Sequence, residues 1–279
     1  MTQQQERALR AIVRGQPTSD GAGVKLKRLI GTHGVSELDP FLLLDEFSSA
    51  QADDYLAGFP DHPHRGFETV TYMLNGRMRH RDNQGNEGLL ASGDVQWMTA
   101  GRGIIHSEMP EQEEGLMRGF QLWVNLPAAE KMKAPRYQDI KAAEIPVVTG
   151  EDGSRIKVIA GRYGEITGPV DGVSLAPLYL DIELAPGASL SVPVPLGHNA
   201  LVNVFEGALH LAGEEVAAGN MAILEDGDVV TLDAGAEGGR ALLIAGRPLN
   251  EPVVRYGPFV MNSQEEINQA IRDYQLGRF

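Results

Sequence analysis

Residues 68–76 read ETVTYMLNG, and residues 199–207 read NALVNVFEG, the same pattern 131 residues further along the chain. Each is an apolar run of equal length that closes on a polar residue and a glycine. Each is followed by a second strand, by a glycine turn at Gly93 or Gly219, and by another apolar strand. An internal repeat of this size predicts two copies of one unit rather than a single large sheet.

Glycine and proline interrupt short apolar runs along the whole chain, with 33 glycines and 16 prolines in 279 residues. Short strands between turns are typical of antiparallel sandwiches and barrels. In the last segment, SQEEINQAIRDYQ, Ser263 and Glu266 have the spacing of a capping box and predict a short terminal helix. We expect an all-β fold of two tandem barrels, residues 1–145 and residues 146–279, with the helix in the second.

Composition and charge exclude several classes of ligand. The chain has 38 acidic residues against 24 lysines and arginines, a formal charge of −14, which disfavours direct binding to nucleic acid or to an anionic membrane. It has no cysteine, which excludes disulfides, thiolate metal sites and cysteine nucleophiles. The N-terminal residues lack the apolar core of a signal peptide, and no apolar run is long enough to span a bilayer. We expect a cytoplasmic protein.

Two histidine-bearing segments carry the candidate chemistry. His62 and His64 are two residues apart, and so are His106 and Glu108. Side chains at this spacing in a strand point to the same face. If both faces line the interior of the first barrel, three imidazoles and one carboxylate meet at one point, which suits a divalent first-row metal ion. The sequence therefore predicts these four residues as metal ligands.

The second copy of the repeat lacks this set. Its aligned positions hold side chains that cannot bind a metal ion, namely Pro193, Pro195, Leu232 and Ala234. We therefore expect metal in the first barrel and not in the second. The remaining histidines have no such partners in the sequence and are assigned no role: His33, His80, His198 and His210.

Residues 62–70, HPHRGFETV, together with residues 96–110, QWMTAGRGIIHSEMP, resemble the pirin family, a branch of the cupin superfamily. Three further blocks are similar to that family: residues 38–47, 120–127 and 257–267. The resemblance extends from about Arg14 to the last residue, and the motifs of the first barrel are the more specific ones. It implies a bicupin fold with an iron-type metal held by His62, His64, His106 and Glu108.

Two questions about individual residues stay open at this point. In the general cupin motif a glutamate four residues after the second histidine can bind metal, and Glu68 stands there, whereas the pirin pattern favours Glu108. Glu68 would then orient a histidine or face elsewhere. Arg65 and Arg102 adjoin the ligand segments and either steer an anionic substrate or support tight glycine turns.

The resemblance also implies an activity, because pirins are similar to quercetin 2,3-dioxygenases in fold and site. The expected substrates are O2 and a quercetin-like flavonol or a related enolisable aromatic. Once deprotonated, the flavonol 3-hydroxyl gives an electron-rich enolate that can itself reduce O2, and Glu108 is expected to be the general base. The expected cofactor is one divalent metal ion, Fe(II), although manganese, nickel, cobalt and copper accept the same ligands.

A metal-dependent regulatory protein is the competing interpretation, since some pirins are described as transcriptional cofactors or as partners of metabolic enzymes. The oxidation state of the metal would then change the surface charge near Arg65 and with it a protein interface. A cupin isomerase or hydrolase that uses the metal as a Lewis acid is a third interpretation. Oxygen uptake distinguishes the dioxygenase from both. We expect a monomer, because one chain already contains two barrels.

Overall fold

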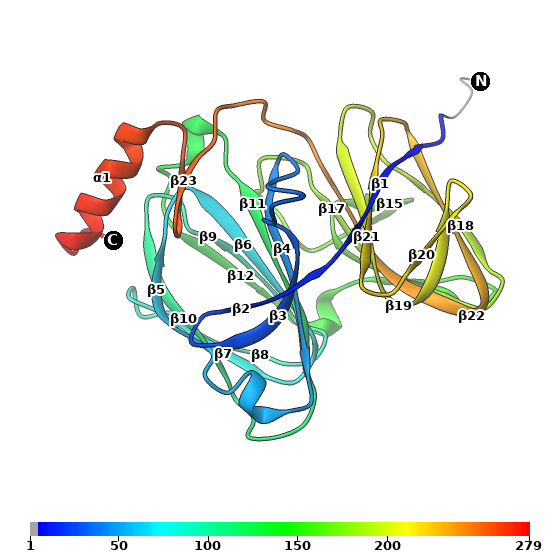
Figure 1. Ribbon diagram of the computed structural model, residues 1–279, viewed down its shortest axis with the longest axis horizontal. Coiled ribbons are helices and arrows are strands. Elements are labelled where there is room, and N and C mark those ends of the chain that lie inside the picture. The colour runs from blue at the N-terminus through cyan, green and yellow to red at the C-terminus, as the bar shows by residue number, and fades with distance from the viewer. Residues whose placement is uncertain (1–4) are drawn as a thin grey trace. The chain divides into compact units, whose positions relative to one another are not determined.

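The computed structural model describes residues 5–279, and strands predominate in it (Figure 1). A single α-helix, α1 (Gln264–Gln275), occurs in this part of the chain, where the sequence predicts it. No helix among residues 5–279 has the length and apolar character that a membrane span requires. The all-β prediction with one terminal helix is confirmed.

Contacts divide the chain into two compact units, which we describe separately. The N-terminal unit consists of residues 16–142 and 249–279, and the C-terminal unit of residues 5–15 and 143–248 among those described. The expected boundary at residue 145 instead keeps each end of the chain in its own half. The ends are therefore exchanged relative to that expectation.

Backbone pairing is the physical reason for this difference. β1 (Leu9–Arg14) pairs antiparallel with β21 (Asn220–Leu224), which ties the start of the chain to the C-terminal unit. β24 (Phe259–Met261) is bridged in parallel to Arg65 through Phe259, which ties the end of the chain to the N-terminal unit. Helix α1 therefore belongs to the unit that contains the histidine segments.

The N-terminal unit contains two larger antiparallel sheets and a hairpin. The seven-stranded sheet has the order β12 (Arg136–Ile140), β9 (Val95–Thr99), β6 (Phe67–Asn75), β11 (Met117–Asn125), β4 (Phe41–Ser49), β3 (Val24–Ile30) and β2 (Gln16–Asp20). The four-stranded sheet has the order β5 (Phe59–His64), β10 (Ile104–Pro110), β7 (Met78–Asp82) and β8 (Glu87–Leu90). The hairpin pairs β23 (Val254–Tyr256) with β24, and two short 3-10 helices are η1 (Ala52–Asp54) and η2 (Ala128–Glu130).

Apolar side chains from both larger sheets of this unit share one core. Val24 and Leu26 of β3 alternate with the exposed Lys25, so that the apolar face of the strand points inward. They pack in one cluster with Met78 of β7 and Leu90 of β8, which belong to the smaller sheet. The two sheets are therefore the layers of a β-sandwich.

The C-terminal unit is built on a nine-stranded sheet. Its main path has the order β1, β21, β19 (Asn199–Leu211), β22 (Val229–Gly246), β17 (Leu178–Leu184), β14 (Arg155–Ala160) and β13 (Val147–Thr149). β18 (Ser189–Pro193) pairs with β22, and β20 (Glu214–Ala217) pairs with β19. The remaining elements are the hairpin of β15 (Arg162–Tyr163) with β16 (Ile166–Thr167), and η3 (Ala142–Glu144).

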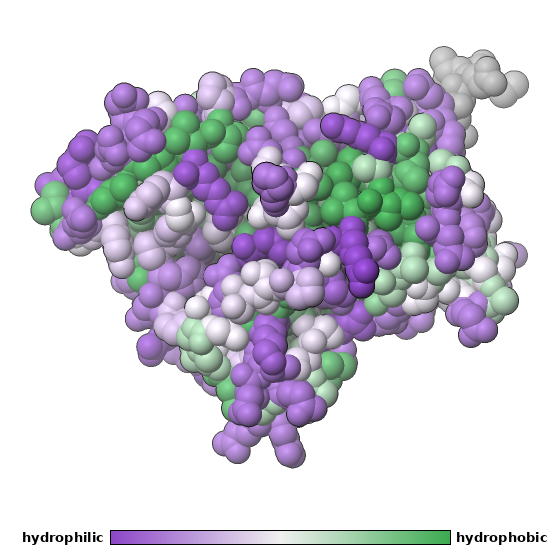
Figure 2. Space-filling model, viewed as in Figure 1, coloured by the Kyte–Doolittle hydropathy of each residue, from purple (hydrophilic) through white to green (hydrophobic). Residues whose placement is uncertain are grey.

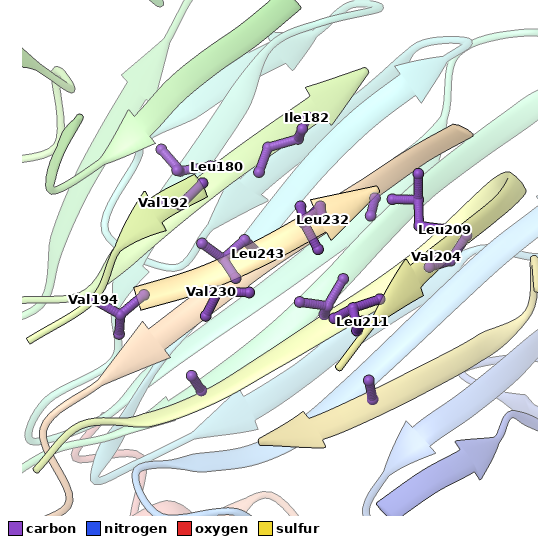
Figure 3. Packing of buried hydrophobic residues seen from close by; sticks show 14 of the residues in the cluster. Leu180, Ile182, Val192, Val194, Val204, Leu209, Leu211, Val230, Leu232 and Leu243 are labelled. Carbon is purple, nitrogen blue, oxygen red and sulfur yellow. The ribbon is translucent and has the colours of Figure 1, made fainter. Parts of the chain in front are cut away.

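Leucine and valine fill the interior of the C-terminal unit (Figure 3). Leu180, Val192 and Leu243 come from three different strands and pack in the same cluster. Leu232, which the repeat aligns with His106, is fully buried among them. At this one aligned position an apolar core residue stands where the first unit has a histidine, whereas Pro193 and Pro195 are exposed.

The internal repeat appears in the strand pairing. Residues 68–76 fall almost entirely in β6, which pairs antiparallel with β9, the strand after the turn at Gly93. Residues 199–207 fall in β19, which pairs in the same way with β21, the strand after the turn at Gly219. Each unit is therefore built around the same pair of strands.

Helix α1 begins with the predicted capping box. The Ser263 side chain accepts a hydrogen bond from the backbone of Glu266, and the Glu266 side chain accepts one from the backbone of Ser263. Its buried residues Ile267 and Ala270 pack against Phe259 of β24. Figure 2 shows a strip of apolar surface beside this helix, on the side where Figure 1 draws β23.

Candidate metal centre

β5 and β10 are antiparallel neighbours, and their pairing brings the two histidine-bearing segments together. His62 lies opposite His106 in the ladder, and His64 lies opposite Ile104. The ligand nitrogens of His62, His64 and His106 all lie within 4.8 Å of one another. Among residues 5–279 they form the one group of at least three histidine and carboxylate side chains that is this close. Three of the four predicted ligands therefore meet in one cluster.

The proton of His62 lies on the nitrogen that points away from the cluster. Its Nδ1 is 2.7 Å from the carbonyl oxygen of Pro60, and a carbonyl only accepts, so Nδ1 is the donor. In the neutral ring Nε2 then carries a lone pair, and it faces His64 Nε2 at 3.0 Å. Either His64 Nε2 carries a proton and donates it to His62 Nε2, or two lone pairs face each other and a cation between them would remove the repulsion.

Burial keeps the other two imidazoles neutral. Desolvation, and then the charges that His106 and His62 would carry, lower the pKa of His64 well below its usual range. Desolvation also lowers the pKa of His106 well below its usual range, with a smaller contribution from His62. Neutral imidazole is the form that binds a metal ion.

The ring of His106 tests whether the cluster fits a metal ion. Both of its nitrogens are buried and have no hydrogen-bond partner within residues 5–279. An unpaired buried polar atom costs roughly 1–3 kcal/mol. A divalent first-row ion among three neutral imidazoles would remove that cost, so the residues present fit the expected group.

Glu108 lies on the same strand as His106 but is not one of the three clustered residues. Its side chain is buried, and its two carboxylate oxygens accept hydrogen bonds from Thr71 Oγ1 and Gln121 Nε2, each at 2.8 Å. Gln121 also lines the pocket at the histidines. The carboxylate is thus held in a fixed orientation beside that pocket.

Glu68 faces a different set of partners. Its carboxylate accepts hydrogen bonds from Trp97 Nε1 at 2.9 Å and Thr99 Oγ1 at 2.6 Å, and Lys133 Nζ lies 3.9 Å away. Burial raises the pKa of Glu68, although the bonds from Thr99 and Trp97 act in the opposite direction. Three roles were open for Glu68: metal ligand, partner of a histidine, or strand residue facing elsewhere. Its hydrogen bonds and ion pair involve no histidine and favour the third.

A pocket of about 510 Å³ opens at the histidines. His62 and His64 line it together with two aromatic side chains, Phe59 and Trp123. The ring of Trp123 meets that of His64 edge to face, with 5.2 Å between centroids. The volume is in the range of pockets that hold drug-sized ligands. The site therefore combines a candidate metal centre with space for an aromatic ligand.

Arg65 and Arg102 take the structural role that the sequence left open. The buried guanidinium of Arg65 donates from Nε to the carbonyl of Arg102 and from Nη1 to Asp273 Oδ2 at 2.9 Å. It also lies over the ring of Phe279, at 4.4 Å from the centroid. Arg102 is exposed and belongs to a turn in which a Cβ at Gly101 would lie 2.2 Å from a backbone oxygen. Neither arginine lines the pocket.

His80 is buried and has its own partners. Its Nε2 lies 3.1 Å from Asp139 Oδ2, and its ring stacks on Tyr137. Gly88 leaves space for the His80 ring, since a Cβ at position 88 would lie 2.2 Å from His80 Nε2. His80 therefore has a partner for Nε2 outside the histidine cluster, while its buried Nδ1 has none among residues 5–279.

The sequence analysis did not identify Gln121, Trp123 or Arg255 as pocket residues. The first two lie two apart on β11, so the alternation in FQLWVNL places them on one face. That signal was available in the sequence. Arg255 lies far from the histidines along the chain and carries no local signal that relates it to them.

Known proteins match the chain over most of its length. The model of the Pirin family matches residues 23–124, and that of the Pirin C-terminal cupin domain matches residues 179–279. A pirin-like protein of Caulobacter vibrioides is 54% identical over 269 residues, which cover 96% of this chain and 97% of that protein. A Pseudomonas aeruginosa protein, provisionally named a quercetin 2,3-dioxygenase, is 53% identical over 270 residues and 94% of both chains.

A solved structure gives the same result for the fold. The crystal structure of a quercetin 2,3-dioxygenase from Acinetobacter baumannii matches with a TM-score of 0.90 and 36% identity, over 98% of both chains. Together with the two family models, this likeness confirms the predicted fold of two cupin domains and a C-terminal helix.

Proposed function

The chain belongs to the pirin family, and on this premise we propose that it is a metal-dependent dioxygenase that acts on quercetin-like flavonols or a related enolisable aromatic. The observation that carries the proposal is the cluster of three histidine side chains, with nitrogens within 4.8 Å of one another, two of which line a pocket together with aromatic residues. The likeness to the Acinetobacter enzyme supports the reaction class.

In this proposal His62, His64 and His106 hold one divalent ion, and Glu108 is the fourth ligand. Fe(II) is the proposed metal, and the same donors accept manganese, nickel, cobalt or copper. When bound, the ion supplies Lewis acidity that favours the ionised form of a substrate hydroxyl. Four protein ligands leave little room for a chelating cosubstrate, which disfavours a 2-oxoglutarate mechanism.

The protein's own side chains bind the substrate and move its proton. Phe59 is partly exposed in the pocket and offers apolar surface to the rings of a flavonol, while the buried Trp123 forms part of the wall behind the histidines. A carboxylate oxygen of Glu108 accepts the proton of the 3-hydroxyl, while Thr71 and Gln121 keep that carboxylate oriented. The enolate so formed is electron-rich and is oxidised by O2, so no external reductant is required.

Oxygen uptake and metal content on the same preparations test this proposal. Protein purified without air should contain about one metal ion per chain, and quercetin should elicit stoichiometric O2 uptake. His62→Ala should lose both, because it removes one of the three nitrogens. His210→Ala is the matched control, since His210 is partly exposed in the C-terminal unit and lines no part of the pocket.

Each result has a definite meaning. Metal and uptake that are both lost in His62→Ala and both retained in His210→Ala support the site and the reaction together. Bound metal without uptake for any flavonol would reject the dioxygenase and leave a metal-dependent binding protein. Such a protein would not signal through Arg65, because that side chain is buried. Protein that takes up no metal would reject the site itself.

A further inference from the structure

Arg255 is a cation in the wall of the candidate substrate pocket. It lies on β23, next to the turn residues Gly257 and Pro258, which also line the pocket. Its Cζ lies 4.7 Å from the centroid of the Trp123 ring. Stacking on an aromatic face holds a guanidinium in place and leaves its N–H groups free at the edge.

The guanidinium of Arg255 has no partner of its own. Arg255 is an exposed side chain that stacks on Trp123, and it makes no hydrogen bond or ion pair with any residue between 5 and 279. The nearby Arg28 differs, because it donates to both carboxylate oxygens of Asp45, at 2.8 and 2.7 Å, and to Asp20 at 2.7 Å. Arg28 is thus neutralised by its partners, whereas the charge of Arg255 remains available to a ligand.

The other charges that line the pocket do not neutralise Arg255. The carboxylate of Asp20 is engaged by Arg28 and by the backbone of Gly21. Asp61 is exposed and precedes the histidine pair. Desolvation, and then repulsion from Arg28, lowers the pKa of Arg255, and a bound anion would offset both effects.

We propose that the substrate of this pocket is an aromatic carboxylate, with its rings beside Phe59 and its carboxylate bound by the N–H groups of Arg255, which Trp123 holds in place. The inference rests on the proposed function, since it specifies the substrate class of the same site. Arginine suits this role because its planar fork matches a carboxylate with two parallel hydrogen bonds. A neutral flavonol such as quercetin would then be an incomplete substrate that leaves Arg255 unpaired.

A matched pair of ligands tests the inference by binding alone. The probes are 3-hydroxyflavone with a carboxylate on the outer phenyl ring and the same compound with a carboxamide, each as the 3′ and the 4′ isomer. Affinity is measured without oxygen on the metal-loaded protein, from the absorbance of the flavonol. Wild type should bind a carboxylate roughly tenfold more tightly than its amide, because a charged, bidentate contact is stronger than a neutral one.

Substitution of the arginine should abolish that preference. Arg255→Met keeps the apolar stem and removes the charge, so the carboxylate and the amide should bind within about twofold of each other. Arg255→Lys keeps the charge without the planar fork and should retain part of the preference. Arg10→Met is the matched control, because Arg10 is an exposed arginine of β1 that does not line the pocket.

Two results would overturn the inference. One is equal affinity of wild type for carboxylate and amide in both isomers. The other is an equal loss of both ligands in Arg255→Met, which would make Arg255 a packing partner of Trp123 and not an anion site. Neither result depends on turnover, so a failure of the proposed dioxygenase reaction would appear separately, as binding of the carboxylate without O2 uptake.

Discussion

At the scale of single residues, the two glutamates near the histidine segments differ in what their carboxylates contact. Glu108 is held by one hydroxyl and one amide beside the pocket, and the amide belongs to a pocket residue. Glu68 is held by an indole and a hydroxyl between two neighbouring strands of the seven-stranded sheet. We therefore expect Glu108→Gln to lower the rate of turnover and Glu68→Gln to lower the stability of the fold.

Glu108→Gln should suppress turnover more than metal content. The amide cannot take up the proton of the substrate hydroxyl, and loss of a general base costs about a hundredfold or more in rate. The three histidines remain and should keep most of the metal. O2 uptake divided by bound metal checks this, and turnover per metal equal to that of wild type would exclude Glu108 as the base.

Glu68→Gln should destabilise the fold and leave the metal in place. The amide can still accept from Trp97 Nε1 and donate to Thr99 Oγ1, but it replaces two charge-assisted hydrogen bonds by neutral ones, at a cost of roughly 1 kcal/mol. Urea unfolding measures the loss of stability, and metal analysis measures the occupancy. If the metal were lost while the stability stayed unchanged, Glu68 would be a ligand after all.

At the scale of secondary-structure elements, helix α1 is joined to the strand that carries the histidine pair. Arg65 directly follows His64, and its guanidinium binds Asp273 of the helix. The backbone of Arg65 also pairs with the β23–β24 hairpin, through Pro258 and Val260. The end of the chain therefore supports the strand that positions the ligands.

Asp273→Asn should loosen this connection. Removal of the carboxylate leaves the buried Arg65 with a weaker partner, at a cost of roughly 1–3 kcal/mol. The unfolding temperature should fall, and the affinity for the metal ion should fall with it, because the strand that carries His64 is held less firmly. Thermal unfolding and metal titration measure the two quantities. Glu265→Gln, which removes the same charge from an exposed position of α1, should leave metal affinity unchanged. Equal effects of the two variants would contradict the connection.

At the scale of the whole molecule, the free energy of unfolding should depend on pH through histidines that the fold keeps neutral. His198, in the C-terminal unit, is one that lies outside the candidate metal centre. Desolvation, and then the charges of Arg7 and Arg247, lower the pKa of His198. The unfolded chain therefore takes up a proton below about pH 6.5 that the folded protein does not, and stability falls as the pH falls.

His198→Gln should flatten this dependence. Urea unfolding of wild type and of the variant, measured above and below about pH 6.5, gives the difference in slope. His210→Gln is the control, because His210 is partly exposed. The same slope in wild type and in His198→Gln would show that other groups account for the acid sensitivity.

Sequence by itself determined the features that depend on short spacings. The three-residue spacing from Ser263 to Glu266 predicted the start of the terminal helix. The H-x-H and H-x-E pairs predicted which side chains share a face of each strand, and three of the four meet in one cluster. The repeat at residues 68–76 and 199–207 predicted two units of the same kind.

Only the tertiary structure decided which distant segments meet. It joined β5 to β10 in the register that sets His62 against His106, exchanged the ends of the chain between the units, and brought Arg255 to the wall of the histidine pocket. Arg65 and Asp273, for example, are 208 residues apart. Side-chain periodicity shows which face of a strand is buried, but the partner strand is chosen by packing and hydrogen bonding across the whole fold, which no local pattern contains.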